Sequence, residues 1–433
     1  MKFQPPRGTR DFLPEEMARR NYIIEKIRKT FESFGFQPLD TPAFESWEVL
    51  SAKGGGGDEI KDEIYYFRDK SDRELGLRFD LTVPLARVVA NNPNLQLPFK
   101  RYQIGKVWRY DKPQAGRMRE FLQMDPDIVG TDRMEADTEC IAAAVEALKG
   151  LGFKKLTVRL NNRKMLNGML EFVNIPAAIS KDVLRVLDKI EKISENEVTG
   201  ELKKIGVESQ KISRLMKLID IRGTPSKTLP EISKLLKGVK PAEDGLKELA
   251  EIASLAKSYG IGQYIVVDMS LVRGLDYYTG PIFEITIQTR QNVGSVAGGG
   301  RYDSLIELFG GRRTLATGIS FGIERIFEVM KSDNMFRAPE NNTKVFVISV
   351  NDMVKKEAIK IAQELRRNGV NTETELMGRN LGKQLEYANR KQIPFALIVG
   401  PKEMKSGKFT LRDMKTGKEI RMGLDKIINK LKY

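Results

Sequence analysis

The first clear pattern in the chain is a set of apolar residues at helical spacing near the N-terminus. The set comprises Met17, Ile24, Ile27, Phe31 and Phe34. Pro14 suits the first position of a helix, because its missing N–H would have no partner there, and Gly35 suits the residue after the end. The pattern predicts a helix from Pro14 to just before Gly35, followed by an extended segment through Pro42.

From Ile64 to Val129 the pattern changes to short β-like runs, which read IYYF, LGLRFDLT, KRYQIGKVWRY and FLQMDPDIVG. A helical pattern then ends at Gly150, and KKLTVRL reads as another strand. Strands with few intervening helices predict an antiparallel sheet in an α+β domain. A Rossmann or P-loop nucleotide site is not expected, since no G-x-G-x-x-G opens a helix after a strand and no Walker A motif occurs.

Later segments extend this organisation. Between residues 174 and 258, Leu, Ile and Lys recur at helical spacing with Gly and Pro breaks, which predicts a small helical insertion. Strand-like runs return between residues 259 and 332 and are expected to complete the first sheet. A polar linker is predicted at residues 331–343, and a compact α/β domain follows it.

The composition agrees with a folded chain of several domains. At roughly 100–200 residues per domain, 433 residues, 41% of them hydrophobic, are enough for two to four cores. The sequence has no run of 18 apolar residues and no apolar signal segment at its start, so we expect a cytoplasmic protein without membrane spans. Its single cysteine, Cys140, excludes an internal disulfide framework and a zinc site with several cysteine ligands.

Histidine does not occur in the chain. Its absence removes Ser-His-Asp triads, imidazole acid–base catalysis and histidine-ligated metals. An enzyme of this composition must use Arg, Lys, Asp, Glu and Tyr, with a hard cation such as Mg²⁺ where one is needed. This set suits reactions that depend on positioning and electrostatics, of which phosphoryl and nucleotidyl transfer are the leading cases.

Positive charge is concentrated at the C-terminal end. Residues 341–433 contain 20 Lys or Arg and 10 Asp or Glu, and therefore carry +10 of the net charge of +15. A solvated, lysine-rich surface is one explanation, and contact with nucleic acid is the other. We favour nucleic acid, because phosphate binding is the commonest use of such an excess.

Several arginines lie in segments that read as buried or strand-borne. They are Arg109, Arg117, Arg119, Arg273 and Arg325. A structural ion pair is the simplest explanation for each one alone. If they converge on one sheet, their planar guanidinium groups would form a clamp for a polyphosphate.

These arginines fall in motifs that resemble a known family. Residues 100–130 are similar to motif 2 of the class II aminoacyl-tRNA synthetases, in the form typical of histidyl-tRNA synthetases. GFQPLDTPAFE, around Pro42, resembles motif 1, and TGISFGIERI, with Arg325, resembles motif 3. LVRGLDYYTG at residues 271–280 and AGGGRYD at residues 297–303 are similar to the two histidine-specific motifs. The resemblance covers essentially the whole chain, and five motifs in order are more specific than any one of them.

The resemblance implies roles for the matching arginines. Arg109 corresponds to the motif 2 arginine that holds the ATP α-phosphate and the substrate carboxylate. Arg325 and Arg117 correspond to arginines that face the β- and γ-phosphates. Arg273 matches an additional arginine that stabilises charge at the α-phosphate. Arg109, Arg273 and Arg325 are thus the implied catalytic residues.

An amino-acid site is implied in the same way. It comprises Asp80, Thr82 and Gln123 at the α-ammonium group, Asp127, Tyr277 and Tyr278 around the imidazole, and Arg109 and Arg273. A carboxylate and a phenol hydroxyl can bond both nitrogens of an imidazole ring, which suits histidine as the substrate.

Three features stay open. Glu120 falls where the family places an ATP-contacting acid, and a charge on the surface of a helix or strand is the alternative. Gly298 to Gly300 are expected to allow close packing of the backbone or its close approach to the ligand, and a generic turn is the alternative. Gln114, in the motif 2 loop, is a candidate contact to the acceptor end of tRNA.

The implied fold is α+β: a class II antiparallel catalytic domain with a helical insertion, followed by an α/β anticodon-binding domain. The implied boundaries are residues 1–173 and 259–332 for the two parts of the catalytic core, 174–258 for the insertion and 342–433 for the anticodon-binding domain.

The implied activity is ATP-dependent ligation of L-histidine to its tRNA through a histidyl-adenylate, in a homodimer formed through motif 1. Mg²⁺ is expected to come with ATP, without His or Cys ligands. The main alternative is a catalytically silent relative that acts as a regulatory subunit or a tRNA sensor. A nucleic-acid-binding protein without catalysis is the third. The basic C-terminal domain and the intact LVRGLDYYTG favour the enzyme.

Overall fold

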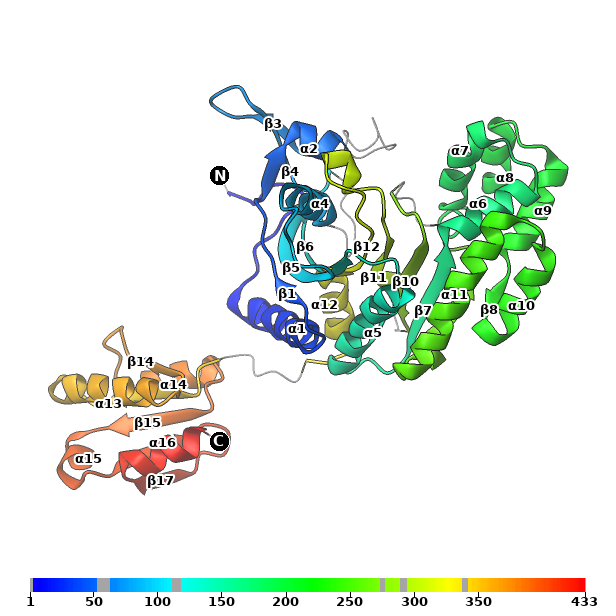
Figure 1. Cartoon of the computed structure of the whole chain (residues 1–433). Helices are drawn as coiled ribbons and strands as arrows, with labels where there is room; N and C mark the ends of the chain where they lie inside the picture. The colour runs from blue at the N-terminus through cyan, green and yellow to red at the C-terminus, as the bar shows by residue number, and fades with distance from the viewer. Residues whose placement is uncertain are drawn as a thin grey trace. The chain divides into compact units, whose positions relative to one another are not determined.

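The computed structural model describes residues 3–52, 63–110, 118–272, 277–288, 294–336 and 342–432. The chain divides into two compact units (Figure 1). One unit comprises residues 1–11 and 23–336, and the other comprises residues 12–22 and 337–433.

A large sheet is the centre of the first unit. Across it, the strands follow in the order β1 (Gln37–Pro38), β5 (Phe99–Trp108), β6 (Glu120–Val129), β12 (Ala316–Gly322), β11 (Ser295–Arg301), β10 (Pro281–Ile287), β7 (Leu156–Asn162), β9 (Ile265–Asp268) and β8 (Arg222–Gly223). Neighbouring strands from β5 to β7 are antiparallel. At the two sides, β1 pairs in parallel with β5 and β9 pairs in parallel with β7. The antiparallel sheet of an α+β fold, predicted from the strand pattern, is confirmed.

The two faces of this sheet differ in character, because successive side chains of a strand point to opposite faces. On one face, Met124 and Phe321 are fully buried, and Phe321 packs against Phe31 with ring centroids 5.6 Å apart. Three helices contribute to this apolar side: α1 (Pro14–Ser33), α5 (Met134–Gly150) and α12 (Ile323–Ser332). The opposite face, called the polar face below, carries Arg101, Gln103, Gln123, Asp125 and Asp127 on β5 and β6.

The N-terminal helix and the helix that ends at Gly150 lie where the apolar spacing predicts them. Helix α4 (Thr82–Asn91) was not predicted, because its β-branched residues favour a strand. Pro84 is compatible with the first turn of a helix, and Leu85 and Val89 lie four residues apart on its buried face. Beside α4, a small sheet is formed by β2 (Phe44–Ser46), β4 (Glu74–Leu77) and β3 (Tyr66–Arg68), next to α2 (Trp47–Ser51).

The predicted helical insertion forms a group of helices beyond the β7 side of the sheet (Figure 1). They are α7 (Ala177–Leu187), α8 (Glu195–Lys204), α9 (Ser209–Ile219), α10 (Pro225–Leu235) and α11 (Lys240–Ser258), preceded by α6 (Arg163–Phe172). The segment also supplies strand β8, which pairs with β9 and extends the sheet. Helices α6 and α11 are in close backbone contact, since a Cβ on Gly168 would lie 2.6 Å from the amide nitrogen of Ala242.

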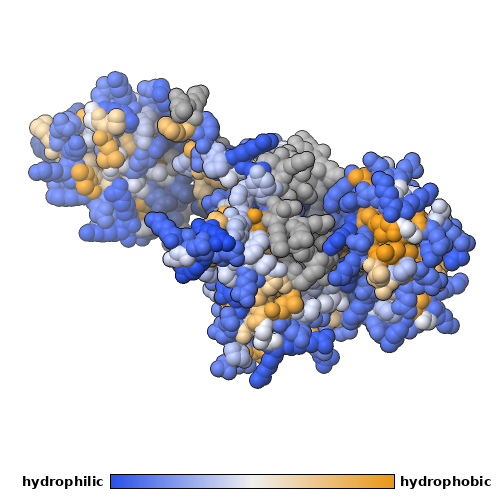
Figure 2. Space-filling model, turned by 90° about the horizontal axis from the view of Figure 1, so that it is seen from above, coloured by the Kyte–Doolittle hydropathy of each residue, from blue (hydrophilic) through white to orange (hydrophobic). Residues whose placement is uncertain are grey.

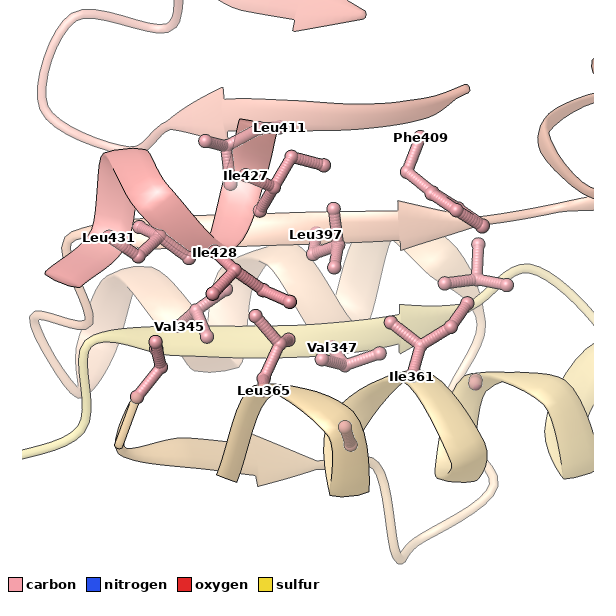
Figure 3. Close-up of a cluster of buried hydrophobic side chains, with 14 of the residues drawn as sticks. Val345, Val347, Ile361, Leu365, Leu397, Phe409, Leu411, Ile427, Ile428 and Leu431 are labelled. Carbon is pink, nitrogen blue, oxygen red and sulfur yellow. The ribbon is translucent and has the colours of Figure 1, made fainter. Parts of the chain in front are cut away.

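The second unit contains a five-stranded mixed sheet. Its strands follow in the order β14 (Thr372–Thr374), β13 (Val345–Ser349), β15 (Phe395–Val399), β16 (Phe409–Asp413) and β17 (Glu419–Met422). The helices are α13 (Lys355–Arg367), α14 (Leu381–Arg390), α15 (Pro401–Ser406) and α16 (Leu424–Lys432). Figure 3 shows the main core, in which Leu365 of α13 and Ile427 of α16 pack on Val345 and Leu397 of the sheet. The α/β character is as predicted, although α15, β17 and α16 were not.

Short 3₁₀ helices connect some of these elements: η1 (Gly262–Tyr264), η2 (Glu307–Phe309) and η3 (Asp352–Val354). On the surface that Figure 2 shows, hydrophilic side chains predominate and apolar ones form scattered patches. Within the described part of the chain, no helix is both long enough and apolar enough to cross a membrane.

Candidate active site

Strand β6 carries a row of three polar side chains in the middle of the polar face. Gln123, Asp125 and Asp127 alternate with apolar residues, and all three are at most 8% exposed. Antiparallel pairing with β5 places Arg101 opposite Asp127 and Gly105 opposite Gln123. The row therefore occupies adjacent positions on one face, as the period of two in a strand requires.

Asp127 is held by a buried cation and a phenol. The guanidinium of Arg101, which is fully buried, lies 2.7 Å from Oδ2 of Asp127, and the hydroxyl of Tyr302 donates to Oδ1 at 2.5 Å. Burial raises the pKa of the Asp127 carboxyl, and Arg101 and Tyr302 oppose the rise. Burial also raises the pKa of Tyr302, so its hydroxyl keeps its proton and donates.

Two more tyrosines lie beside this pair. The ring of Tyr277 packs edge-on against Tyr278 at 4.7 Å and against Tyr302 at 5.9 Å, measured between ring centroids. The structure thus brings Asp127, Tyr277 and Tyr278, which the resemblance assigns to one ligand group, together through Tyr302.

Glycines on β11 and β12 leave the adjoining part of the polar face without side chains. Gly300 pairs with Gly318, which in turn pairs with Asp127. A Cβ on Gly318 would lie 2.0 Å from Oδ1 of Asp127, and one on Gly300 would lie 2.9 Å from the ring of Tyr278. Close packing therefore explains Gly299 and Gly300. Residues 298–300 all belong to strand β11, so the alternative of a turn is wrong.

Gln123 and Asp125 are joined by Ser320. The amide Nε2 of Gln123 donates to the hydroxyl oxygen of Ser320 at 2.7 Å, and the Ser320 hydroxyl bonds the Asp125 carboxylate. Burial, followed by the nearby Asp127, raises the pKa of Asp125 to about 8. A carboxyl with such a pKa in the interior of a sheet is a candidate functional group.

Asp80 and Arg109 lie near each other at the end of the β5–β6 hairpin. Oδ1 of Asp80 accepts a hydrogen bond from the Val83 N–H at 3.0 Å, which ties it to the first turn of α4, where Thr82 is half-buried. Nε of Arg109 donates to the carbonyl of Phe79, the residue before Asp80, at 2.9 Å. Backbone groups on the two sides of Asp80 thus hold both side chains: the Val83 N–H holds the carboxylate of Asp80, and the Phe79 carbonyl holds the half-buried guanidinium of Arg109.

Arg325 follows β12 in the first turn of α12. Its Nη1 donates to the carbonyl of Ser295 at 2.5 Å. The neighbouring Glu324 is 7% exposed and accepts from the Leu122 N–H at 3.1 Å, so α12 is attached to β6 next to Gln123.

Glu120 occupies a different position from the other predicted residues. Strand alternation directs it away from the polar face, and its carboxylate accepts bonds from Lys106 at 2.8 Å and from the indole of Trp108 at 3.0 Å. Both partners are on β5. These contacts favour the alternative interpretation, in which Glu120 is a structural charge of the hairpin.

Three predicted residues, Gln114, Arg117 and Arg273, lie outside the described residues. The chain that leads toward residue 273 is nevertheless anchored. Arg159 binds the fully buried Asp268 at 2.8 Å, and Nδ2 of Asn161 donates to the carbonyl of Leu271 at 3.0 Å.

Sequence reasoning missed four residues of the site: Arg101, Asp125, Tyr302 and Ser320. A signal for the first two existed, because they fall at alternate positions with Gln103, Gln123 and Asp127 in strands that are otherwise largely apolar. Tyr302 and Ser320 lie within AGGGRYD and TGISFGIERI, but only the folded sheet shows which members of these motifs face the site.

An antiparallel sheet with this strand order, with buried charged residues on its polar face and with Arg109 and Arg325 at one end, is typical of a class II aminoacyl-tRNA synthetase. The family described as "Histidyl-tRNA synthetase" matches residues 8–326, and "Anticodon binding domain" matches residues 344–433. The chain belongs to the histidyl-tRNA synthetase family.

Individual relatives agree over nearly the full length. The chain is 39% identical to the histidine–tRNA ligase of Pyrococcus horikoshii, over 98% of both chains. It is 41% identical to that of Aeropyrum pernix, over 98% of this chain and 97% of the relative. The crystal structure of histidyl-tRNA synthetase from Nostoc sp. PCC 7120 is similar with a TM-score of 0.88 and 31% identity, covering 100% of this chain and 99% of that one.

Proposed function

We propose that the polar face binds histidine and ATP and that its residues catalyse the formation of histidyl-adenylate, from which histidine passes to its tRNA. Ligation of histidine to tRNA with ATP is the activity of the family to which the chain belongs. The assignment of each step to particular residues rests on their order in the sheet.

The observation that carries this proposal is the order of groups along β6. Asp127, with Tyr302, lies toward one end, Gln123 follows, and Arg109 lies beyond the other end of the row. Histidyl-adenylate has its imidazole, ammonium group and phosphoryl ester in the same order. An acceptor for the imidazole, an acceptor for the ammonium group and a cation for the phosphate therefore follow one another as the intermediate requires.

The amino acid binds with its imidazole at Asp127, Tyr277 and Tyr278. A carboxylate that accepts from one ring nitrogen and a phenol that donates to the other distinguish imidazole from apolar side chains. The α-ammonium group binds at Asp80, Thr82 and Gln123, which supply acceptors only a few residues from the imidazole site.

The phosphates of ATP bind to arginines. Arg109 holds the α-phosphate and the histidine carboxylate, Arg117 and Arg325 face the β- and γ-phosphates, and Arg273 stabilises charge at the α-phosphate. The carboxylate is already an anion, so it attacks the α-phosphorus in line and releases pyrophosphate without a general base. Fixed cations at the developing charge lower the barrier.

Magnesium enters with ATP as the counter-ion of its phosphates. Mg²⁺ is commonly held by substrate phosphates with one or two protein carboxylates.

The other parts of the chain serve the tRNA. Residues 342–433 bind the anticodon, which accounts for the excess of Lys and Arg in this segment. Residues 1–173 and 259–332 form the catalytic core, 174–258 form the insertion, and Gln114 contacts the acceptor end. The enzyme acts as a homodimer in the cytoplasm, with motif 1 at the dimer interface.

Exchange of labelled pyrophosphate into ATP, with and without histidine, tests the proposal. Histidine-dependent exchange is expected, because adenylate formation is reversible. Exchange that does not respond to histidine, or no exchange by folded protein, would favour a regulatory or tRNA-sensing relative. Arg73 is an exposed arginine between β3 and β4, so the variant Arg73→Gln provides a control for substitutions of the arginines in the site.

A further inference from the structure

Asp125 is the central member of the polar row and has no role in the assignments above. It lies two residues from Gln123 and two residues from Asp127 on the same face of β6, and it is 3% exposed. The adjoining strand contributes Gly318 and Ser320 to this face rather than large side chains. Asp125 therefore lies between Gln123, which is assigned to the ammonium group, and Asp127, which is assigned to the imidazole.

Three buried oxygens in this row have no hydrogen-bond donor among the residues that the structure describes. One of them, Oδ2 of Asp127, forms an ion pair with Arg101, and within the same described residues the other two face no cation as near. These two are Oδ1 of Asp125 and Oε1 of Gln123. Ser320 connects the two side chains through their other polar atoms, so it holds both in place and leaves these two oxygens available. A buried acceptor without a donor costs on the order of 1–3 kcal/mol, and two such acceptors side by side indicate a ligand that supplies several N–H groups.

The charges of the polar face indicate the sign of that ligand. Three buried carboxylates, Asp80, Asp125 and Asp127, interact with one another across the face. Within the described residues, the buried cations that act on them are Arg101 and Arg78. Arg78 also interacts with Asp40 and Glu45, so the carboxylates around this face outnumber these two cations when all are ionised, and a cationic ligand is favoured.

We propose that Asp125 is a third carboxylate of the amino-acid site and that its Oδ1 accepts a hydrogen bond from the α-ammonium group of histidine. The inference rests on the proposed function and extends it to a residue outside the motif assignments. An ammonium group has three N–H donors and a full charge, so it bonds Oδ1 of Asp125 and Oε1 of Gln123 together. A neutral imidazole has one N–H and no charge, and its acceptor, Asp127, lies on the Tyr302 side of the row.

The state of Asp125 in the free enzyme supports this role. Its pKa, raised to about 8 by burial and by Asp127, keeps much of the carboxyl neutral near pH 7. An incoming cation lowers that pKa and favours the ionised form. The groups that face Asp125 from the surrounding elements are Asp80, Arg78, Arg101, Asp127 and Ser320.

The test compares two ligands that differ in the ammonium group. Histidinol keeps the ammonium group and the imidazole of histidine, and imidazole propionate lacks the ammonium group. Their dissociation constants, and that of histidine, are measured by calorimetry on the full-length wild type and on Asp125→Asn. Asp132→Asn makes the same chemical change at an exposed position after the same strand and serves as the control.

Asp125→Asn should bind histidine and histidinol about 10- to 100-fold more weakly, the range expected for a hydrogen bond to a charged group. Imidazole propionate should bind within twofold of its wild-type affinity, and the KM for ATP should stay within twofold. Ser320→Ala leaves the carboxylate in place and removes its link to Gln123. Ser320→Ala should lower the affinity for histidinol by a smaller factor, about three- to tenfold. It serves as the second variant if Asp125→Asn does not fold.

Two results would overturn the proposal. Unchanged affinity for histidine and histidinol would show that Asp125 does not contact the substrate. Equal losses for histidinol and imidazole propionate would show a contact to the imidazole instead. Absence of histidine-dependent exchange by the wild type would refute the proposed function itself, whereas exchange with unchanged binding by Asp125→Asn would refute only the role of Asp125.

Discussion

Arg101 and Asp127 lie directly opposite each other on β5 and β6, with a guanidinium nitrogen 2.7 Å from a carboxylate oxygen and both side chains buried. Arg101 also donates to the carbonyls of Leu81 and Asp125, each at 3.2 Å. One side chain therefore connects the start of α4, the middle of β6 and the residue assigned to the imidazole. Neither residue could be replaced alone without leaving a buried charge.

Replacement of Arg101 by Met should destabilise the protein by about 3–5 kcal/mol, because the carboxylate of Asp127 would stay buried without its cation. Denaturant unfolding of the catalytic unit measures this change. The double variant Arg101→Met/Asp127→Leu should lose less stability than the sum of the two single variants, since no charge is then left unpaired. Additive losses would argue against a coupled pair. Arg28→Met, on an exposed face of α1, should leave stability nearly unchanged.

Tyr302→Phe should raise the KM for histidine and leave the KM for ATP unchanged. The substitution removes the hydroxyl that donates to Oδ1 of Asp127. A hydrogen bond to a charged group contributes about 1.5–3 kcal/mol, so we expect a rise of roughly ten- to a hundredfold in that KM. Steady-state pyrophosphate exchange gives both constants. Tyr66→Phe removes a hydroxyl from an exposed carboxylate, Glu74, and should have no effect. Equal changes in both KM values for Tyr302→Phe would point to a general loss of structure.

Asp125→Asn should make the protein more stable than the wild type, and increasingly so as pH rises. The pKa of Asp125 is raised from an ordinary value near 3.8 to about 8 in the folded state. A raised carboxyl pKa stabilises the fold below the unfolded value, and that contribution is lost as pH rises through the folded value. The midpoint of thermal unfolding should therefore differ least near pH 4 and most above pH 8. A difference that does not depend on pH would contradict the raised pKa.

Arg109→Gln should lower the rate of pyrophosphate exchange by about 100- to 1,000-fold, the range found when one preorganised donor at a developing charge is removed. The fold should be retained, because the backbone N–H of Arg109 still donates to the carbonyl of Arg119 at 2.9 Å. Circular dichroism and the unfolding midpoint check this. The control Arg73→Gln should exchange at the wild-type rate. A loss below threefold in Arg109→Gln would remove this residue from the phosphate site.

Several parts of the fold could be predicted from the sequence because their signals are local. Helix α1 begins at Pro14 and ends just before Gly35, whose φ of +81° few other residues adopt. Strands β5 and β6 could be recognised because their sequences are rich in aromatic and β-branched residues. Helix α4 could not, since the local preference of Val83, Val88 and Val89 for a strand is outweighed by the burial of its apolar face, which includes Leu85.

The sequence by itself determined the class of the protein and the candidate residues of its site, because Arg109, Asp127 and Arg325 stand within recognisable motif-like segments. Only the tertiary structure decided which side chains share a face. Strand pairing placed Arg101 against Asp127, directed Asp125 into the row and turned Glu120 to the opposite side. The physical reason is that a sheet brings together residues from strands far apart in the chain. The partner of a buried charge depends on strand order and register, which no local pattern of residues specifies.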